Sequence, residues 1–283
     1  MTSETDTASE PARHYDTVVG AWGYLLQEDL HYGYFETGSE PLVVATNALT
    51  NQMLALAKLS TGQQVLDIGC GTGKAACRIA QEFDCQVTGI SPSTQCITNA
   101  TAKAAELGQE ALVQFRIGDG MAPDFPDASF DCTWVMESSH LMQDKTALIR
   151  ECARLLKPGG RFMLCDVMLG RKLSLSEVID HRDDFLLLKD VFGRAVMEPL
   201  EFYEQQCGAN GLIVEHSRNI SAETLPTFDR WHDNSLQNRA TVSEMIGDEA
   251  CKQFSDSCYV LRNFWESAVL GYGIISALKA DSV

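Results

Sequence analysis

The spacing of hydrophobic and polar positions changes repeatedly between residues 60 and 170. Short runs of β-branched and apolar residues, typical of buried strands, alternate with stretches whose apolar positions recur every three or four residues, as in helices. The predicted strands are Gln64–Ile68, Cys85–Ile90, Val113–Ile117, Phe130–Met136 and Arg161–Met168, and the predicted helices are Lys74–Glu82, Thr94–Leu107 and Lys145–Leu155. This alternation across short loops predicts an α/β fold, with helices on both faces of a parallel sheet.

The rest of the chain surrounds this core. Two more strands are predicted at Leu212–Asn219 and Gly273–Leu278, and the last one closes the chain against a sheet begun far earlier. The predicted parts are a disordered tail (1–13), an N-terminal helical lid (14–60), the core (61–170) and a C-terminal part (171–283) with helical insertions at about 171–205 and 221–265. Helices added above the carboxyl edge of such a sheet usually shape a substrate pocket.

The amino-acid composition limits which molecules the protein is expected to bind and where in the cell it is expected to lie. The 283 residues include 22 basic and 39 acidic side chains, a net charge of −17, and such an acidic surface disfavours nucleic acid and, weakly, anionic membranes. No apolar run reaches the roughly 18 residues of a membrane helix. The start of the chain does not resemble a secretory signal, which favours the cytoplasm.

Ten cysteines are spread singly through apolar segments, with no C-x-x-C pair. This pattern favours buried free thiols in a reducing compartment over a disulfide framework or a metal centre, so no metal is expected.

A glycine-rich turn is the strongest chemical signal. Gly69, Gly71 and Gly73 follow a strand directly and open a helix. Glycine serves where the backbone turns sharply against a ligand, and a helix N-terminus attracts negative groups, so a nucleotide-like ligand is expected at the carboxyl edge of the sheet.

Two common readings of such a turn fail here. A phosphate-binding loop needs G-x-x-x-x-G-K-[ST], whereas Ile68 and Ala75 occupy the first and last of those positions. A dinucleotide fingerprint needs G-x-G-x-x-G, whereas Lys74 occupies the third glycine position. The second strand also ends without an acid for a ribose diol, so NAD is disfavoured.

The run D-x-G-C-G-T-G, with its acid on the preceding strand, resembles the first motif of class I S-adenosylmethionine (SAM) methyltransferases. Ala128–Asp131 is similar to that family's D-x-S-F-D segment, and Leu155–Gly160 to its L-K-P-G-G turn. His14–Asp16, Leu30–Phe35 and Glu137–His140 extend the similarity to the small-molecule group of the rebeccamycin sugar O-methyltransferase and tocopherol methyltransferases. The resemblance implies a Rossmann-like, mostly parallel sheet of seven strands, a lid, and SAM as cofactor.

The resemblance also implies roles for single residues. The glycine loop makes room for the methionine part of SAM and Asp67 holds its amino group, with a loop-capping acid as the alternative. Ser91 meets the ribose diol and Gln95 assists, although an ungapped comparison puts Cys96 at the family's glutamine position. The implied cofactor-binding residues are Tyr15, Tyr32, Asp67, Gly69, Gly71, Gly73, Ser91, Gln95, Asp119, Gly120, Met121 and Glu137, where Asp119–Met121 resembles the adenine site.

Two residues are candidates for proton transfer. An oxygen acceptor, and some carbon acceptors, must lose a proton during methyl transfer, and histidine suits this task near neutral pH. His140 follows the fourth strand and Asp166 ends the fifth. Since those strands should be parallel neighbours, a histidine base oriented by an aspartate is expected at the carboxyl edge. A satisfied loop histidine and a capping acid are the alternative.

The acceptor site is less defined by sequence. Candidate residues are His31, Tyr34, Phe192, Phe228 and Trp231, for which packing in the core or of the lid is the alternative. The expected function is methyl transfer from SAM to an oxygen or carbon of a small, largely apolar or aromatic specialised metabolite. N-methylation of an amine or alkaloid stays open, as does a SAM-binding scaffold with a non-methylating reaction such as a cyclisation. The N-terminal helices can pack on their own core or on a second copy, so a homo-oligomer stays open.

Overall fold

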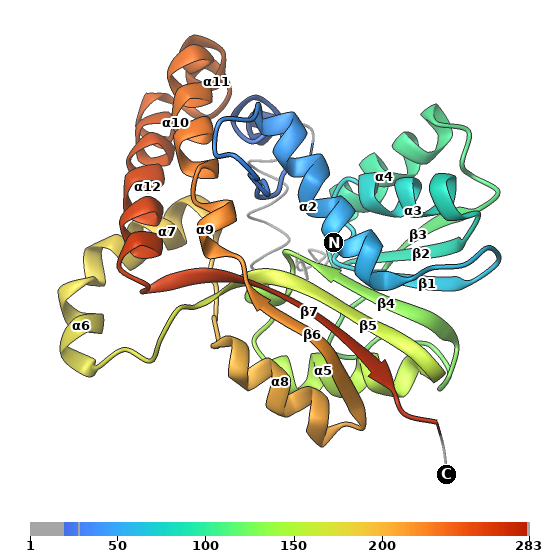
Figure 1. Ribbon diagram of the computed structural model, residues 1–283. Coiled ribbons are helices and arrows are strands. Elements are labelled where there is room, and N and C mark those ends of the chain that lie inside the picture. Colours follow the sequence, from blue (N-terminus) through green and yellow to red (C-terminus); the bar gives the residue numbers. More distant parts are fainter. Residues whose placement is uncertain (1–19, 28, 282–283) are drawn as a thin grey trace, which may run out of the picture.

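The computed structural model, which describes residues 20–27 and 29–281, is built on one seven-stranded sheet (Figure 1). The strands are β1 (Gln64–Ile68), β2 (Gln86–Ser91), β3 (Val113–Ile117), β4 (Phe130–Met136), β5 (Leu156–Leu169), β6 (Leu212–Asn219) and β7 (Leu270–Lys279). Their order is β3-β2-β1-β4-β5-β7-β6, and β7 runs antiparallel to both of its neighbours. The mostly parallel, seven-stranded α/β fold expected from the sequence is confirmed.

Helices cover both faces of the sheet. On one side lie α2 (Leu42–Ala57), α3 (Lys74–Phe83) and α4 (Thr94–Glu106), and on the other lie α5 (Lys145–Leu155) and α8 (Leu200–Ala209) (Figure 1). Each helix buries one apolar stripe; α3, for example, buries Ala76, Cys77, Ile79 and Ala80 at helical spacing. Because the crossover helices lie on the faces, the carboxyl ends of β1 to β5 remain together at one edge.

A group of helices lies beyond this edge, where β5 ends and β7 begins (Figure 1). We call α7, α10, α11 and α12 the cap; its bounds are Arg182–Phe192, Thr227–Gln237, Arg239–Ile246 and Asp248–Glu266. The short helices α6 (Leu175–Asp180) and α9 (Ser221–Thr224) lead into it. The two insertions are separated in sequence by α8 and β6, yet α7 packs against α12.

The N-terminal part is only partly helical. Residues 20–25 and α2 are helices, whereas residues 29–41 form an irregular segment that we call the lid loop. Its backbone is fixed on two sides, since Tyr34 N donates to Ala45 O and Phe35 N donates to Glu223 O, each at 2.8 Å. Gly33 leaves no space for a side chain, because an added Cβ would lie 2.6 Å from the Cβ of Ala45. The tail expected at 1–13 lies outside the described residues.

Most of the predicted element bounds agree with the structure to within one residue. The fifth strand differs: β5 begins at Leu156, and the K-P-G-G turn is a register shift between Phe130↔Leu156 and Cys132↔Arg161. The last strand is also longer than expected, because residues 270–278 pair with β5 along its length. The insertion expected at 171–205 includes the start of α8, which instead packs against α5 and β6.

Candidate active site

The glycine loop joins β1 to α3 and is tied to the end of the neighbouring strand β2. The backbone N–H groups of Gly69 and Cys70 both donate to Ile90 O, at 2.9 and 3.1 Å. Gly69, Gly71 and Gly73 have φ values of +82°, +50° and +78°, a region that favours glycine. Backbone hydrogen bonds to β2 and the positive φ angles of its glycines therefore fix the shape of the loop.

The three glycines are needed for different reasons. An added Cβ on Gly69 would lie 2.2 Å from the Cβ of Ser138, and one on Gly73 would lie 2.6 Å from the ring of Phe115. Among the described residues, an added Cβ on Gly71 would meet no atom within 4 Å. Gly69 and Gly73 thus allow neighbouring side chains of the protein to pack against the loop, whereas Gly71 borders space that is open among the described residues.

Asp67, near the end of β1, carries an unsatisfied carboxylate oxygen. Its side chain is buried, and Oδ2 has no hydrogen-bond partner among the described residues. Burial raises the pKa of Asp67 to about 7. A buried carboxylate without a partner suits a cationic group such as an ammonium, and the open space at Gly71 lies along the same loop. Both features fit a ligand with the amino group of SAM.

Ser91, at the end of β2, and Gln95, in the first turn of α4, differ in whether their side chains face the interior of the protein. Ser91 is buried, and its hydroxyl accepts from Ser93 N at 3.2 Å. Ser93 caps α4 by accepting from Cys96 N, which turns Cys96 inward and leaves Gln95 exposed. The Gln95 amide donates to Asn99 on its own helix at 2.8 Å. Ser91 ends β2, which pairs with β1, the strand that leads into the glycine loop. Gln95 points away from this region, since it is exposed and bonds Asn99.

The expected adenine site forms a turn after β3. Asp119 is exposed, and its Oδ1 accepts from Met121 N at 2.9 Å. The Met121 sulfur accepts from Asp144 N at 3.4 Å, which holds this thioether near the start of α5. Gly120 is buried, and an added Cβ there would lie 2.5 Å from Ile68 Cγ2 at the end of β1.

His140 and Asp166 meet as the sequence predicted. His140 lies in a short 3-10 helix (Ser139–Leu141) after β4, and Asp166 is a fully buried residue of β5. His140 Nδ1 lies 2.7 Å from Asp166 Oδ1, and His140 N donates to Asp166 Oδ2 at 3.0 Å. Burial acts to raise the pKa of Asp166, but the charge and hydrogen bonds of His140 outweigh it and hold that pKa below its usual value.

This geometry fixes the histidine tautomer. An ionised carboxylate can only accept, so Nδ1 of His140 carries the hydrogen and Nε2 is left with its lone pair when the ring is neutral. The backbone is held as well, because Val196 N donates to His140 O at 2.8 Å. The His140 side chain is 17% exposed, whereas that of Asp166 is fully buried.

A second buried acid connects the lid loop to the sheet. Glu137, just after β4, has a φ of +50°, and its Oε1 accepts from Tyr32 N at 2.9 Å and from the Tyr272 hydroxyl at 2.6 Å. Burial raises the pKa of Glu137 to about 8. Glu137 therefore positions Tyr32, whose ring stacks on Trp265 at a centroid distance of 5.6 Å.

His31 is occupied within the lid loop. Its Nδ1 lies 2.8 Å from Tyr32 O and its Nε2 lies 3.3 Å from the hydroxyl of Thr50 on α2. Burial lowers the pKa of His31, which favours a neutral ring. Next to it, Asp29 forms a 2.7 Å ion pair with Lys74, the first residue of α3. These contacts fix His31 within the lid loop, and the Asp29–Lys74 ion pair joins that loop to the start of α3.

The residues predicted to bind the acceptor lie in two separate parts of the structure, of which the cap is the first. Phe228 and Trp231 are buried in the cap, and their ring centroids lie 5.7 and 4.8 Å from that of Tyr32. Phe192 is half-buried and lies 6.3 Å from Trp231. They join the cap to the lid loop as one aromatic cluster.

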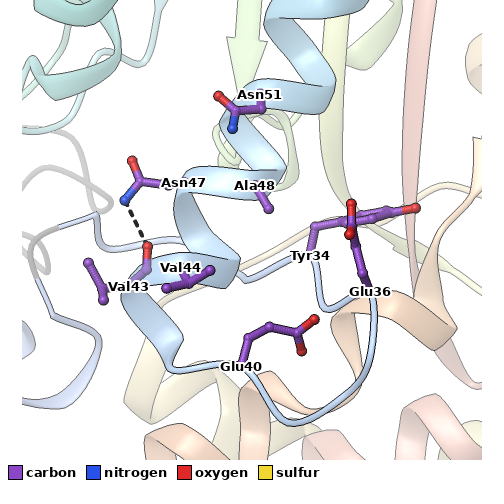
Figure 2. Close-up of a pocket in the computed structure, with 8 residues that line it drawn as sticks. All are labelled: Tyr34, Glu36, Glu40, Val43, Val44, Asn47, Ala48 and Asn51. Carbon is purple, nitrogen blue, oxygen red and sulfur yellow. Dashed lines mark hydrogen bonds between the residues drawn. The ribbon is translucent and has the colours of Figure 1, made fainter.

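Tyr34 lies elsewhere and lines a pocket of about 400 Å³ between the lid loop and the start of α2 (Figure 2). Its hydroxyl accepts from Arg218 Nη2 at 3.2 Å. Tyr15 lies outside the described residues, so its expected role stays a prediction.

Sequence reasoning missed several residues that the structure brings to this edge. Tyr203, Tyr272 and Ser139 are fully or almost fully buried and bond to Glu137, to Asp166 or to one another. The spacing of Leu200, Tyr203 and Cys207 indicates an inward helical face, but no local pattern shows what a hydroxyl there would reach.

Other kinds of site find little support in the structure. Within 20–27 and 29–281, no group of three or more His, Cys, Asp or Glu residues could hold a metal ion. No helix in those ranges is long and apolar enough to cross a membrane. All ten cysteines lie within the described residues, and they are buried thiols that form no disulfide.

Known proteins share both the sequence and the fold. A family model described as a methyltransferase domain matches residues 66–164. The 27-O-demethylrifamycin SV methyltransferase of Amycolatopsis mediterranei is 34% identical over 277 residues, covering 97% of this chain and 98% of that protein. A probable chloroplastic tocopherol O-methyltransferase of Oryza sativa subsp. japonica is 29% identical and covers 78% of this chain and 61% of its own.

Comparison with solved structures shows the same fold. The 4+2 cyclase SpnF superposes with a TM-score of 0.80 and 26% identity, covering 96% of each chain. The cyclopropane synthase MmaA2 of Mycobacterium tuberculosis shares the fold, with a TM-score of 0.85 and 16% identity over 98% of this chain and 100% of its own. Near-complete coverage of a methyltransferase at 34% identity establishes the family, and the glycine loop and the buried Asp67 agree with it. The chain belongs to the class I S-adenosylmethionine-dependent small-molecule methyltransferases.

Proposed function

We propose that this enzyme methylates a hydroxyl oxygen of a small, largely apolar specialised metabolite, with His140 as the general base. The 2.7 Å contact between His140 Nδ1 and the buried Asp166 carboxylate carries the proposal, because it leaves Nε2 as the acceptor of a proton. A hydroxyl oxygen is a weak nucleophile until it loses its proton and so needs such a base, whereas a neutral amine is already nucleophilic. The rifamycin relative is likewise named for methylation at an oxygen.

Bound SAM supplies the electrophilic methyl group. The chain supplies the surroundings: Asp67 and the loop at Gly71 hold the amino acid end, Ser91 the ribose, and Asp119 to Met121 the adenine. His140 Nε2 takes the acceptor's hydroxyl proton, and Asp166 stabilises the imidazolium that results. The aromatic cluster of Tyr32, Phe228 and Trp231 adds apolar surface between the lid loop and the cap, which suits an apolar acceptor and excludes water.

The test is His140→Gln, which keeps a polar side chain of similar reach. We expect turnover to fall by about 10²- to 10⁴-fold while SAM affinity stays near wild type. His232→Gln is a matched control, since the His232 ring bonds the Ser255 and Tyr259 hydroxyls within the cap. Unchanged turnover in His140→Gln would refute the base and favour a nitrogen acceptor.

A second candidate is a SAM-binding scaffold that catalyses a cyclisation without methyl transfer. The likeness to the cyclase SpnF, at 26% identity over nearly the whole chain, favours retaining it. The two candidates differ in whether SAM is converted to S-adenosylhomocysteine in step with product. Stoichiometric conversion supports methyl transfer, and product without conversion supports cyclisation.

A further inference from the structure

The Asp166 carboxylate accepts more hydrogen bonds than the dyad alone requires. Its Oδ1 receives His140 Nδ1 and Val167 N, each at 2.7 Å, and its Oδ2 receives His140 N at 3.0 Å and the Ser139 hydroxyl at 2.6 Å. Each hydrogen bond to an ionised group stabilises its charged form. Ser139 is thus a direct partner of the carboxylate that orients His140.

The direction of the next hydrogen bond follows from counting hydrogens. The single hydroxyl hydrogen of Ser139 is donated to Asp166, because an ionised carboxylate can only accept. The Tyr203 hydroxyl, 3.2 Å from Ser139 Oγ, must therefore donate to Ser139. Tyr203 and Ser139 are both 0% exposed, so bulk water does not replace either bond. The result is one chain of donors from Tyr203 on α8 through Ser139 to Asp166.

We propose that Ser139 and Tyr203 are positioning residues that act on His140 through Asp166. This inference rests on the proposed role of His140 and adds two residues to it. Ser139 holds Oδ2 so that Oδ1 faces the imidazole, and Tyr203 fixes the Ser139 hydroxyl in the orientation that reaches Asp166. The chain also links α8, behind the sheet, to the base at its carboxyl edge.

Neither Ser139→Ala nor Tyr203→Phe adds or removes a charged side chain near the dyad. Glu137 and Lys145 face Asp166, and Glu198 lies near both Lys145 and Tyr203. Tyr32 and Cys165 also face this region, and burial raises the pKa of each, which keeps them neutral near pH 7. A change in the titration of His140 on removal of a hydroxyl therefore reports on the donor chain.

The experiment is a double-mutant cycle of Ser139→Ala and Tyr203→Phe, with Tyr259→Phe as a control that removes a tyrosine hydroxyl bonded to His232 in the cap. We expect kcat to fall about tenfold in Ser139→Ala and about threefold in Tyr203→Phe, with KM for SAM unchanged. Because Tyr203 acts through Ser139, the double variant should match Ser139→Ala alone.

A second readout does not depend on turnover. The ¹⁵N NMR signals of the His140 ring, followed against pH in the ligand-free protein, should show a shifted midpoint in Ser139→Ala and Tyr203→Phe but not in Tyr259→Phe. Additive effects in the cycle, or an unchanged His140 titration, would overturn the proposal. If His140→Gln kept full turnover, the base would be wrong, while the NMR titration would still decide whether the donor chain acts on His140.

Discussion

The Tyr272 hydroxyl donates to the Glu137 carboxylate across 2.6 Å, and the same oxygen, Oε1, accepts the backbone N–H of Tyr32. This pair connects β7, the end of β4 and the lid loop at one buried point. We expect Tyr272→Phe to lower the free energy of unfolding by about 1–3 kcal/mol, because Glu137 loses a donor inside the protein. Amide hydrogen exchange at residues 31–35 should become faster. Exchange as slow as in wild type would show that Tyr272 does not hold the lid loop.

Two buried acids should make the ligand-free protein less stable at higher pH. Burial raises the pKa of Glu137 to about 8 and that of Asp67 to about 7, above their unfolded values. The folded state therefore retains protons that the unfolded state has lost, and the free energy of unfolding falls as pH rises from about 5 to 8.

Glu137→Gln isolates one of these acids, because its amide oxygen can still accept from Tyr32 and Tyr272. Urea denaturation at several pH values should show a shallower decline with pH than in wild type. Parallel declines for the two proteins would rule out Glu137 as a source of the pH dependence.

SAM affinity should increase with pH if Asp67 binds the amino group. Below about pH 7 the Asp67 carboxyl is protonated in the free protein, and it must ionise to pair with an ammonium. We expect Kd to rise about tenfold for each pH unit below this pKa, with uptake of SAM releasing a proton. Calorimetry in buffers of different ionisation enthalpy measures that proton. In Asp67→Asn the affinity should be lower and nearly independent of pH, and a retained pH dependence would exclude Asp67.

Gly71 offers a sharp test of where the cofactor lies. Gly71→Ala places a methyl group, at a φ of +50°, in space that no atom of the described residues occupies. Gly62→Ala is the matched control, since Gly62 has a φ of +79° and equally open surroundings in the turn before β1. Both variants should lose about 1 kcal/mol of stability, and only Gly71→Ala should lose SAM affinity. Equal SAM affinity in the two variants would place the ligand elsewhere.

The sequence was most informative where one physical rule dominates. The bounds of β1, β3 and β4 follow from short apolar runs between turns, and the meeting of His140 with Asp166 follows from two neighbouring parallel strands. Such rules act along one strand or between adjacent strands, so they can be read without coordinates.

Other features depend on long-range packing, which no single segment of the sequence shows. The lid loop is not helical, because Tyr34 and Phe35 bond backbone groups of α2 and α9 rather than their own helix. Gln95 is exposed because Ser93 caps α4 and sets the rotation of its first turn. The roles of Tyr203 and Tyr272 depend on contacts 64 and 135 residues away, which no local pattern encodes.

The central claim, methyl transfer to an oxygen of a small metabolite, is tested most directly with SAM that carries a ¹³C-labelled methyl group. The enzyme is incubated with a panel of hydroxylated, amine-bearing and unsaturated apolar compounds, and the products are analysed by NMR and mass spectrometry. We expect the label in an O-methyl group, one S-adenosylhomocysteine per product, and loss of both in His140→Gln. Label on nitrogen or carbon, or product formed without consumption of SAM, would contradict this account.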